Sequence, residues 1–192
     1  MKNLFLTLKS WQLFLLIFLI PFIIGVVSIN YLFNSLHYHY WMKSIFGLLL
    51  FLEIGDLLWK HSIVFGLGKQ ISTEFQVKKN SFYIFFILRF LSLFVFLKLI
   101  NYLAYCSYTD GVKFPIGDAL GTIIVVLGGS FLFSFLAQIG IVVLTAKTLK
   151  TIETQRKITF SDYIGNAFLF YFSPIGIFIL QPQINNLISD DL

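Results

Sequence analysis

The chain has 192 residues, of which 58% are hydrophobic and only 12% are charged, and its mean hydropathy is +0.86. A soluble globular domain carries about 25% charged residues, so this composition excludes an ordinary soluble domain and indicates that apolar surface faces lipid. The net charge of +5 does not indicate a nucleic-acid partner. The basic residues lie between apolar runs, where they orient membrane proteins. A single cysteine, Cys106, excludes an internal disulfide.

The first apolar run follows a short basic segment. Lys2 and Lys9 precede Trp11, and residues 12–33 then form an apolar stretch that contains Pro21. A membrane helix needs about 20 apolar residues. A cleaved signal peptide is the alternative, but its apolar core would be about 7–15 residues long and would end in a small-x-small cleavage site. We therefore predict a retained first span.

Two further apolar stretches carry charged residues. Residues 44–59 contain Glu53 and Asp56, which are three apart and share one helix face, and residues 82–103 contain Arg89. At a rise of about 1.5 Å per residue, Glu53 and Arg89 lie at nearly the same depth, roughly 10 Å from one membrane surface. Charge in a bilayer costs roughly 2.5–3.5 kcal/mol even on the lowest scales. We therefore predict an ion pair between Arg89 and Glu53, with Asp56 nearer the interface, which either fixes helix register or forms a proton or ion site.

The longest apolar stretch covers residues 119–146, with no charge between Asp118 and Lys147. Small residues share one of its faces, at spacings of about one and two turns: Gly117, Gly121 and Gly128. Polar residues share the opposite face: Ser130, Ser134 and Gln138. Because small side chains let membrane helices approach closely, we predict that this helix is the centre of the bundle and has neighbouring helices on both faces.

Residues 163–180 form a fifth apolar stretch, which Pro174 interrupts and Gln181-Pro182 end. Proline removes a backbone donor and bends a helix. This segment therefore either crosses the membrane or forms a re-entrant or interfacial helix. Taken together, the pattern predicts an all-α, polytopic transmembrane helical bundle of about five spans, in a single domain at 1–192.

The basic residues predict the orientation of this bundle. One side of a five-span arrangement holds Lys2, Lys9, Lys60, Lys69, Lys78, Lys79, Lys147, Lys150, Arg156 and Lys157, whereas the other holds Lys43 and Lys113. Lysine and arginine are enriched in cytoplasmic loops. We therefore predict an N-terminus in the cytoplasm of a cell with an inner (plasma) membrane, cytoplasmic loops at 60–81 and 147–162, and outer loops at 31–42 and 104–115.

Segments near both ends of the chain resemble a known group of proteins. Residues 157–165 (KITFSDYIG) and 173–185 (SPIGIFILQPQIN) resemble the tail of small uncharacterised bacterial inner-membrane proteins. Residues 10–14 (SWQLF) and Pro21 are similar to their amino-terminal segment. The resemblance implies a polytopic bacterial inner-membrane protein, and it implies no activity because none is assigned to that group.

Sequence patterns typical of catalysis are missing from the chain. It has no Gly-x-Ser-x-Gly motif, no His-Glu-x-x-His motif and no Walker-type loop. The alternate residues His37 and His39 have no third metal ligand nearby, and Cys106 has no evident base partner. We therefore predict no catalytic residue, no metal and no cofactor.

The expected partners are the lipid bilayer and either another membrane protein or further copies of the chain. We interpret the chain as a structural or accessory subunit of a membrane complex, because it combines small-residue faces, short loops and few intramembrane charges. A small transporter or oligomeric channel is the alternative, since intramembrane charge and an interrupted helix are typical of that class. A membrane enzyme is the least favoured interpretation.

Overall fold

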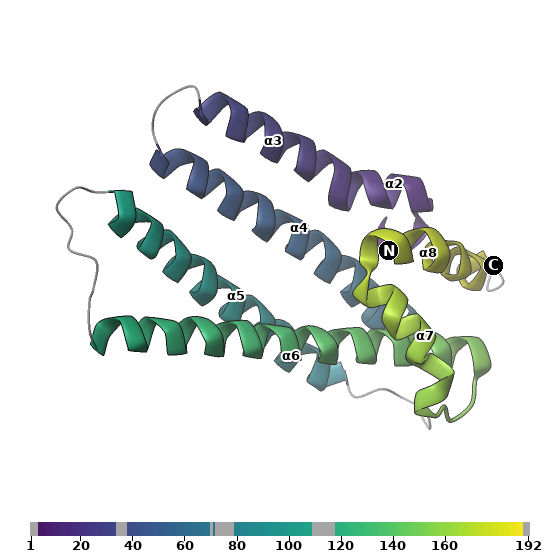
Figure 1. The fold of residues 1–192 in the computed structure, drawn as a ribbon. Coiled ribbons are helices and arrows are strands. Elements are labelled where there is room, and N and C mark those ends of the chain that lie inside the picture. The colour runs from purple at the N-terminus through teal and green to yellow at the C-terminus, as the bar shows by residue number, and fades with distance from the viewer. Residues whose placement is uncertain (1–3, 34–37, 70, 72–78, 109–117, 190–192) are drawn as a thin grey trace.

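The structure, a computed structural model, describes residues 4–33, 38–69, 71, 79–108 and 118–189, and every regular element in them is helical (Figure 1). The elements in chain order are α1 (Leu4–Thr7), α2 (Ser10–Phe14), the π-helix η1 (Leu15–Leu19), α3 (Ile20–Phe33), α4 (Tyr38–Gly66), the 3₁₀-helix η2 (Leu67–Lys69), α5 (Lys79–Tyr108), α6 (Asp118–Thr154), α7 (Phe160–Tyr171) and α8 (Ser173–Ser189).

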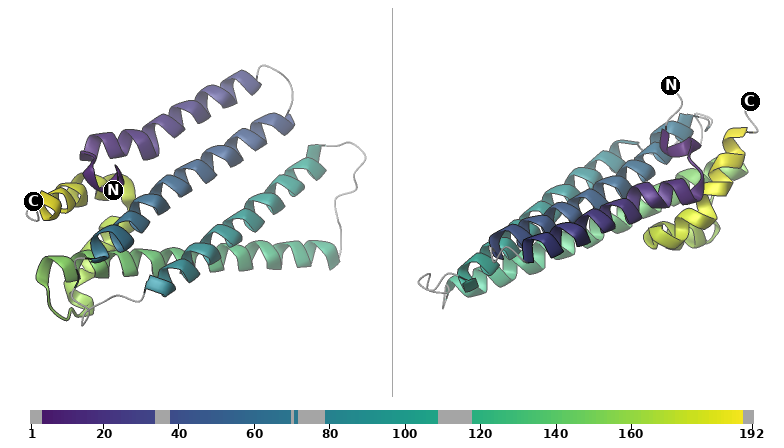
Figure 2. Two further views of the ribbon diagram at one scale, coloured as in Figure 1. Left: turned by 180° about the vertical axis from the view of Figure 1, so that it is seen from behind. Right: turned by 90° about the horizontal axis from the view of Figure 1, so that it is seen from above.

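The long helices run lengthwise through the molecule, and the last two helices pack across one end. Helix α6 contacts α4, α5 and α7, whereas α4 contacts α1, α3, α5 and α6, so α6 is not the single centre that the sequence predicts. Helix α7 packs against α6 and against α8, and α8 also contacts α1 and α2. Figures 1 and 2 show that both chain termini lie at this same end of the bundle.

The first apolar run forms one nearly continuous rod from α2 through η1 to α3. It begins after Lys9, whose backbone N–H donates a 3.0 Å hydrogen bond to Oε1 of Gln12. The widened π turn directly precedes Pro21. Proline cannot donate to the carbonyl four residues earlier, and its ring would clash with that carbonyl in a regular α-helix. The π turn therefore accommodates Pro21 without ending the helix.

Three helical segments of the described chain are long and apolar enough to cross a membrane: Ser10–Val27, Asn80–Leu103 and Gly121–Thr154. They correspond to the first, third and fourth predicted spans. The prediction of about five spans by length and composition is therefore too high. Helix α4 is long enough, at 29 residues, but Lys43, Glu53, Asp56 and Lys60 interrupt its apolar sequence.

The second apolar stretch also ends later than predicted. Instead of giving way to a loop at Lys60, α4 continues to Gly66 and then turns through η2. Trp59 and Lys60 are both fully buried. The residues from 60 to 69 are thus part of the packed helix, while 70 and 72–78 lie outside the described residues.

The fifth apolar stretch is divided between two helices instead of forming one rod. Phe172 leaves the helical conformation between α7 and α8, with φ −92° and ψ 57°. A Cβ on Gly176 would collide with the backbone carbonyl of Leu169, so the start of α8 packs directly against the backbone of α7. At 12 and 17 residues, neither helix is a candidate span. Together they form a helical hairpin, which we name the α7–α8 hairpin.

Most of the buried apolar side chains gather at the end of the bundle that carries this hairpin. The main core joins side chains from α1, α2, α4, α6, α7 and α8: Leu6, Leu13, Trp59, Ile63, Ala146, Leu149, Phe170, Ile177, Leu180 and Ile184 are among its members. A smaller core follows it between α4, α5 and α6: Leu57, Val64, Phe82 and Ile141. The C-terminal half of α6 lies in both cores.

Gln181 of α8 connects α8 to α4 and to the N-terminal segment through hydrogen bonds. Its Oε1 accepts a 3.0 Å hydrogen bond from Nε1 of Trp59. Its Nε2 faces the backbone oxygens of Phe5, Leu6 and Leu8 at 3.0–3.3 Å. Phe5 and Leu6 belong to α1, and Leu8 lies in the short link between α1 and α2. A buried glutamine therefore supplies donors where the first helix is interrupted.

Helix α6 is longer than a bilayer is thick. Its 37 residues extend about 55 Å at 1.5 Å per residue, whereas the hydrocarbon core measures about 30 Å. Large apolar side chains are exposed as far as Ile139, whereas Ile141 and Val142 begin a mostly buried segment. Only the first part of α6 therefore has a surface suited to lipid.

Candidate functional site

Arg89 of α5 and Glu53 of α4 form an ion pair with two parallel contacts. Nε of Arg89 lies 2.5 Å from Oε1 of Glu53, and Nη2 lies 3.0 Å from Oε2. The side chains are 16% and 15% exposed. This fork geometry fixes the orientation of both groups and adds strength to each hydrogen bond. The pairing expected from their similar depth is thus present in the structure.

Ser134 of α6 completes this arrangement. Nη1 of Arg89 donates to its hydroxyl oxygen at 2.7 Å and to its backbone carbonyl at 3.0 Å. Ser134 itself is buried. The guanidinium group therefore joins three helices, and we name this set of residues, Glu53, Arg89 and Ser134, the Arg89 triad.

Fewer side chains of α4, α5 and α6 are buried on one side of the Arg89 triad than on the other. On one side lies the smaller apolar core described above. On the other side, within residues 47–52, 90–103 and 121–133, the only buried side chains that the structure describes are Ser92, Leu97 and Ser130. The triad therefore connects the three helices at the edge of the smaller core, and beyond it α5 and α6 still meet where the ring centroids of Phe96 and Phe131 are 6.1 Å apart.

Asp56 does not join this arrangement. It is 7% exposed, and its Oδ2 accepts a hydrogen bond from Nζ of Lys60 at 2.5 Å, one turn further along α4. Lys60 is fully buried, although the sequence placed it in a loop. The sequence predicted that Asp56 lies nearer the interface than the pair of Arg89 and Glu53. In the structure Asp56 instead forms a separate buried ion pair with Lys60 of the same helix. Oδ1 of Asp56 is buried without a hydrogen-bond partner.

The predicted small-residue face of α6 has no neighbour among the residues that the structure describes. A Cβ built on Gly121 or Gly128 would meet nothing within 4 Å, and Gly117 lies outside the described residues. The close approach occurs instead at Gly140, where an added Cβ would lie 2.8 Å from the ring of Phe85. The sequence pattern therefore identified a face that this chain leaves open, and it missed the glycine at which α5 and α6 meet.

The opposite, polar face of α6 has three different environments. The hydroxyl of Ser130 donates to the Leu127 carbonyl of its own helix at 3.0 Å. Ser134 belongs to the Arg89 triad. Gln138 lies one turn further on, and its Oε1 is buried without a hydrogen-bond partner. Of the five described α6 residues singled out from the sequence, only Ser134 contacts the predicted ion pair through a hydrogen bond.

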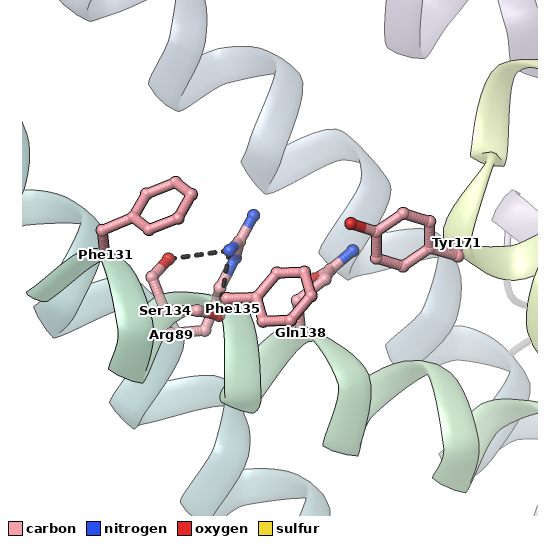
Figure 3. A pocket seen from close by; sticks show the side chains of 6 residues that line it. All are labelled: Arg89, Phe131, Ser134, Phe135, Gln138 and Tyr171. Atoms are coloured by element: carbon pink, nitrogen blue, oxygen red, sulfur yellow. Dashed lines mark hydrogen bonds between the residues drawn. The ribbon is translucent and has the colours of Figure 1, made fainter. Parts of the chain in front are cut away.

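A cavity of about 350 Å³ opens beside the triad. Its lining residues come from α5, α6 and α7: Arg89, Phe131, Ser134, Phe135, Gln138 and Tyr171. Figure 3 shows the Tyr171 ring pointing toward Gln138 from the α7 side, with Phe135 between Gln138 and the triad. The rings of Phe135 and Tyr171 meet edge to face with centroids 6.5 Å apart. The cavity thus combines polar atoms at its base with aromatic walls.

The residues of this site offer hydrogen-bonding groups and apolar contact. Within the described residues no group of three histidine, cysteine, aspartate or glutamate side chains could hold a metal ion.

No protein-family model, no curated protein sequence and no solved structure matches the chain. The arrangement of residues is therefore the basis for a functional proposal.

Proposed function

We propose that the chain is a structural or accessory subunit of a larger complex in a bacterial inner membrane. The resemblance of residues 157–165 and 173–185 to small inner-membrane proteins supports the location. The polar contacts support the role: the Arg89 triad joins helices within the chain, and Asp56 pairs with Lys60. A subunit that stabilises an assembly needs such polar contacts within its own chain, and it needs an open surface for its partner.

The proposal includes a topology of four crossings and a re-entrant α7–α8 hairpin. Helix α4 packs against α3, α5 and α6, which supports a fourth crossing despite its charges. The termini lie at the same end of the bundle (Figure 2), which fits an even number of crossings. With the basic segments on the cytoplasmic side, the N-terminus, the link between α6 and α7 and the C-terminal end of α8 are cytoplasmic. The loop predicted at 147–162 is shorter in the structure, because α6 continues to Thr154 and α7 begins at Phe160.

Cysteine labelling in intact cells tests this topology. Cys106 is replaced by serine, and single cysteines are introduced by Lys69→Cys and Asp110→Cys. An impermeant thiol reagent should label the cysteine at 110 and leave the cysteine at 69 unlabelled until the membrane is opened. The reverse pattern would contradict the orientation.

The observation that carries the subunit proposal is the open face of α6. Gly121 and Gly128 have free space beyond them, and exposed apolar side chains such as Ile124 and Val125 flank them. Lipid chains can cover such a face, but glycine brings no advantage against lipid, whereas it lets a second helix approach the backbone closely. We therefore assign this face to a transmembrane helix of a partner protein.

Bulky substitutions on this face test the assignment. Gly121→Leu and Gly128→Leu should leave the thermal stability of the isolated chain unchanged, because both positions are open. They should reduce the amount of the larger assembly recovered in mild detergent by about tenfold, which corresponds to about 1.4 kcal/mol. Gly165→Leu, at an open position on α7, is the matched control. An assembly that both α6 variants leave intact would contradict the proposal.

A transporter or channel is the second candidate, and the cavity beside Arg89 favours it. Intramembrane charge next to a cavity is a common property of transport pathways. Native mass spectrometry of the purified protein distinguishes the two candidates. A ring made only of this chain would support a pore, whereas a stable complex with a different membrane protein would support the accessory role.

A further inference from the structure

The outer face of α7 carries a row of exposed apolar side chains. Ala167 and Phe170 lie on the opposite face of the helix and belong to the main core. The row repeats every four residues, so its members share one face. They are 44–64% exposed: Phe160, Ile164, Phe168 and Phe172. The ring centroids of the last two are 4.7 Å apart, and we name these four residues the α7 row.

The α7 row needs an apolar environment. The sequence has no charged residue between Asp162 and Asp190, and exposed apolar side chains continue on α8, where Ile175 and Ile179 are 63% and 45% exposed. Large exposed apolar patches mark surfaces that contact a membrane or another protein. Either lipid chains or a partner protein therefore cover the row.

The apolar surface of α6 continues into the α7 row, and this continuity favours lipid. The ring of Tyr171 lies 5.2 Å from that of Phe172, centroid to centroid, and 6.5 Å from that of Phe135 of α6. Phe135 is 40% exposed and belongs to a segment that is long and apolar enough to cross a membrane. Because the two surfaces meet at Tyr171, the hydrocarbon that surrounds the span also reaches the row.

Basic residues lie at the base of the hairpin, where α6 ends and α7 begins. Residues 147–162 contain four basic and two acidic residues. Each acidic residue already has a basic partner: Lys150 pairs with Glu153 at 2.8 Å, and Arg156 pairs with Asp162 at 3.4 Å. The two other cations, Lys147 and Lys157, are exposed and form no ion pair with any residue that the structure describes. A net charge of +2 is therefore left for an external anion.

Both cations lie close to the start of the α7 row. Lys157 stands three residues before Phe160. Lys147 follows Ala146, which lies in the same core as Ala167 of α7. Basic residues beside the apolar face of a helix are typical of segments that bind an anionic membrane surface.

We propose that the base of the hairpin binds anionic phospholipids of the cytoplasmic leaflet, with their head groups at Lys147 and Lys157 and their acyl chains along the α7 row. This inference rests on the re-entrant hairpin of the proposed topology and adds the class of lipid that the hairpin contacts. It does not use the glycine face of α6, so the subunit role and the lipid site can fail separately.

Fluorescence quenching in lipid vesicles tests the proposal on the complete chain. Ile164→Cys, combined with Cys106→Ser, places a bimane label on the α7 row. The vesicles consist of phosphatidylcholine, to which a quencher lipid is added: either phosphatidylglycerol or phosphatidylcholine, each with a nitroxide on one acyl chain. One cation near an anionic surface strengthens binding by a factor of about five. Nitroxide-labelled phosphatidylglycerol should therefore reach half-maximal quenching at about a fivefold lower mole fraction than nitroxide-labelled phosphatidylcholine.

A second label position shows whether the preference is local. Leu91 is 58% exposed on the candidate span of α5, and a bimane at Leu91→Cys should be quenched equally by the two lipids. Equal quenching at position 164 as well would overturn the proposal. The same preference at both positions would overturn it too, because the charge of the whole protein would then explain the effect. A label at 164 that neither lipid quenches would assign the row to water or to a partner protein instead.

Charge variants connect the preference to the two lysines. Lys147→Gln together with Lys157→Gln should abolish the preference, whereas Lys147→Arg together with Lys157→Arg keeps both charges and should retain it. Lys98→Gln removes an exposed cation of α5, far along the chain from the hairpin, and is the matched control. If Ile164→Cys does not fold, Phe168→Cys, at a side chain that is 64% exposed, carries the label instead. A preference for phosphatidylglycerol that survives the glutamine pair would contradict the proposal.

Discussion

Nε1 of Trp59 donates a 3.0 Å hydrogen bond to Oε1 of Gln181, and both side chains are fully buried although 122 residues separate them in sequence. The same glutamine faces the carbonyl oxygens that α1 leaves without helical partners. Its Nε2 has two hydrogens, so the neighbouring acceptors share them. One side chain thus connects the N-terminal segment, α4 and α8.

Replacing Gln181 should therefore destabilise the whole hairpin end. Gln181→Leu leaves the Trp59 N–H buried without its partner and removes the donor that faces the Leu6 carbonyl, at about 1–3 kcal/mol for each group. We expect a loss of about 3 kcal/mol in the free energy of unfolding, measured by denaturant titration in mild detergent. Gln183→Leu, at an exposed position of the same helix, should change stability by less than about 0.5 kcal/mol. Equal losses in the two variants would contradict this account.

The geometry of the Arg89 triad predicts that Arg89 and Glu53 are energetically coupled. Arg89→Ala or Glu53→Ala leaves the other charge largely buried and unpaired, so each should cost about 3–5 kcal/mol. The double variant should be less destabilised than the sum of the two, because it leaves no lone charge. Lys98→Ala, at an exposed cation of the same helix α5, is the control and should have little effect. Strictly additive losses would remove the ion pair as a source of stability.

The tip of the α7–α8 hairpin depends on a glycine that touches backbone. Gly176→Ala would place a methyl group against the Leu169 carbonyl, and neither main chain can move without separating the two helices. We expect a loss of more than about 2 kcal/mol, in the range of overpacked sites. Gly165→Ala adds the same methyl group to an open position of α7, and it should raise stability by up to about 1 kcal/mol through helix propensity. Thermal unfolding in detergent compares the two variants.

The start of α7 predicts a dependence on pH. The backbone N–H of Thr159 donates to Oδ2 of Asp162 at 2.7 Å, and the Thr159 hydroxyl donates to the same oxygen at 2.9 Å. These bonds, helped by the charges of Arg156 and Lys150, hold the pKa of Asp162 below its ordinary value of 3.8. A lowered pKa in the folded state stabilises the protein above pH 3.8 and ceases to do so as the pH falls through the folded value.

Asp162→Asn should therefore be less stable than the native chain at pH 7. As the pH falls below about 4, the difference between the two should decrease, because the native carboxyl group also becomes neutral. Unfolding midpoints measured from pH 7 to pH 3 follow this change. A difference that stays constant over the whole range would show that the charge of Asp162 has no part in capping α7.

The sequence predicted the helices better than it predicted what they contact. Apolar runs near 20 residues long revealed the first, third and fourth spans, because membrane helices need that length. The depth of Arg89 and Glu53 predicted their pairing, because charges in a bilayer need partners. The continuation of α4 through Lys60 was missed, since a lysine after an apolar run usually marks the end of a span. An acidic residue one turn earlier, Asp56, was the available signal.

The cavity and the hairpin depend on contacts that single helices do not reveal. Tyr171 lines the cavity only because α7 leads back toward α6, and the sequence contains no sign of that direction. Pro174 did indicate a break in the fifth stretch, and the turn at Phe172 lies two residues before it. The glycine pattern of α6 marked Gly121 and Gly128, whereas the contact inside the chain falls on Gly140. Which face of a helix meets its neighbour depends on the angle at which the two helices cross.

The smaller number of buried side chains beyond the Arg89 triad has a consequence for how the protein responds to membranes of different thickness. Helices adjust to a thicker or thinner hydrocarbon layer by changing their tilt. Beyond the triad, the described parts of α4, α5 and α6 bury few side chains against each other, so a change of tilt there breaks few contacts. The cores beside the hairpin resist such a change. Adaptation to bilayer thickness is therefore confined to the half of the bundle beyond Arg89, and the end that carries both termini keeps its geometry.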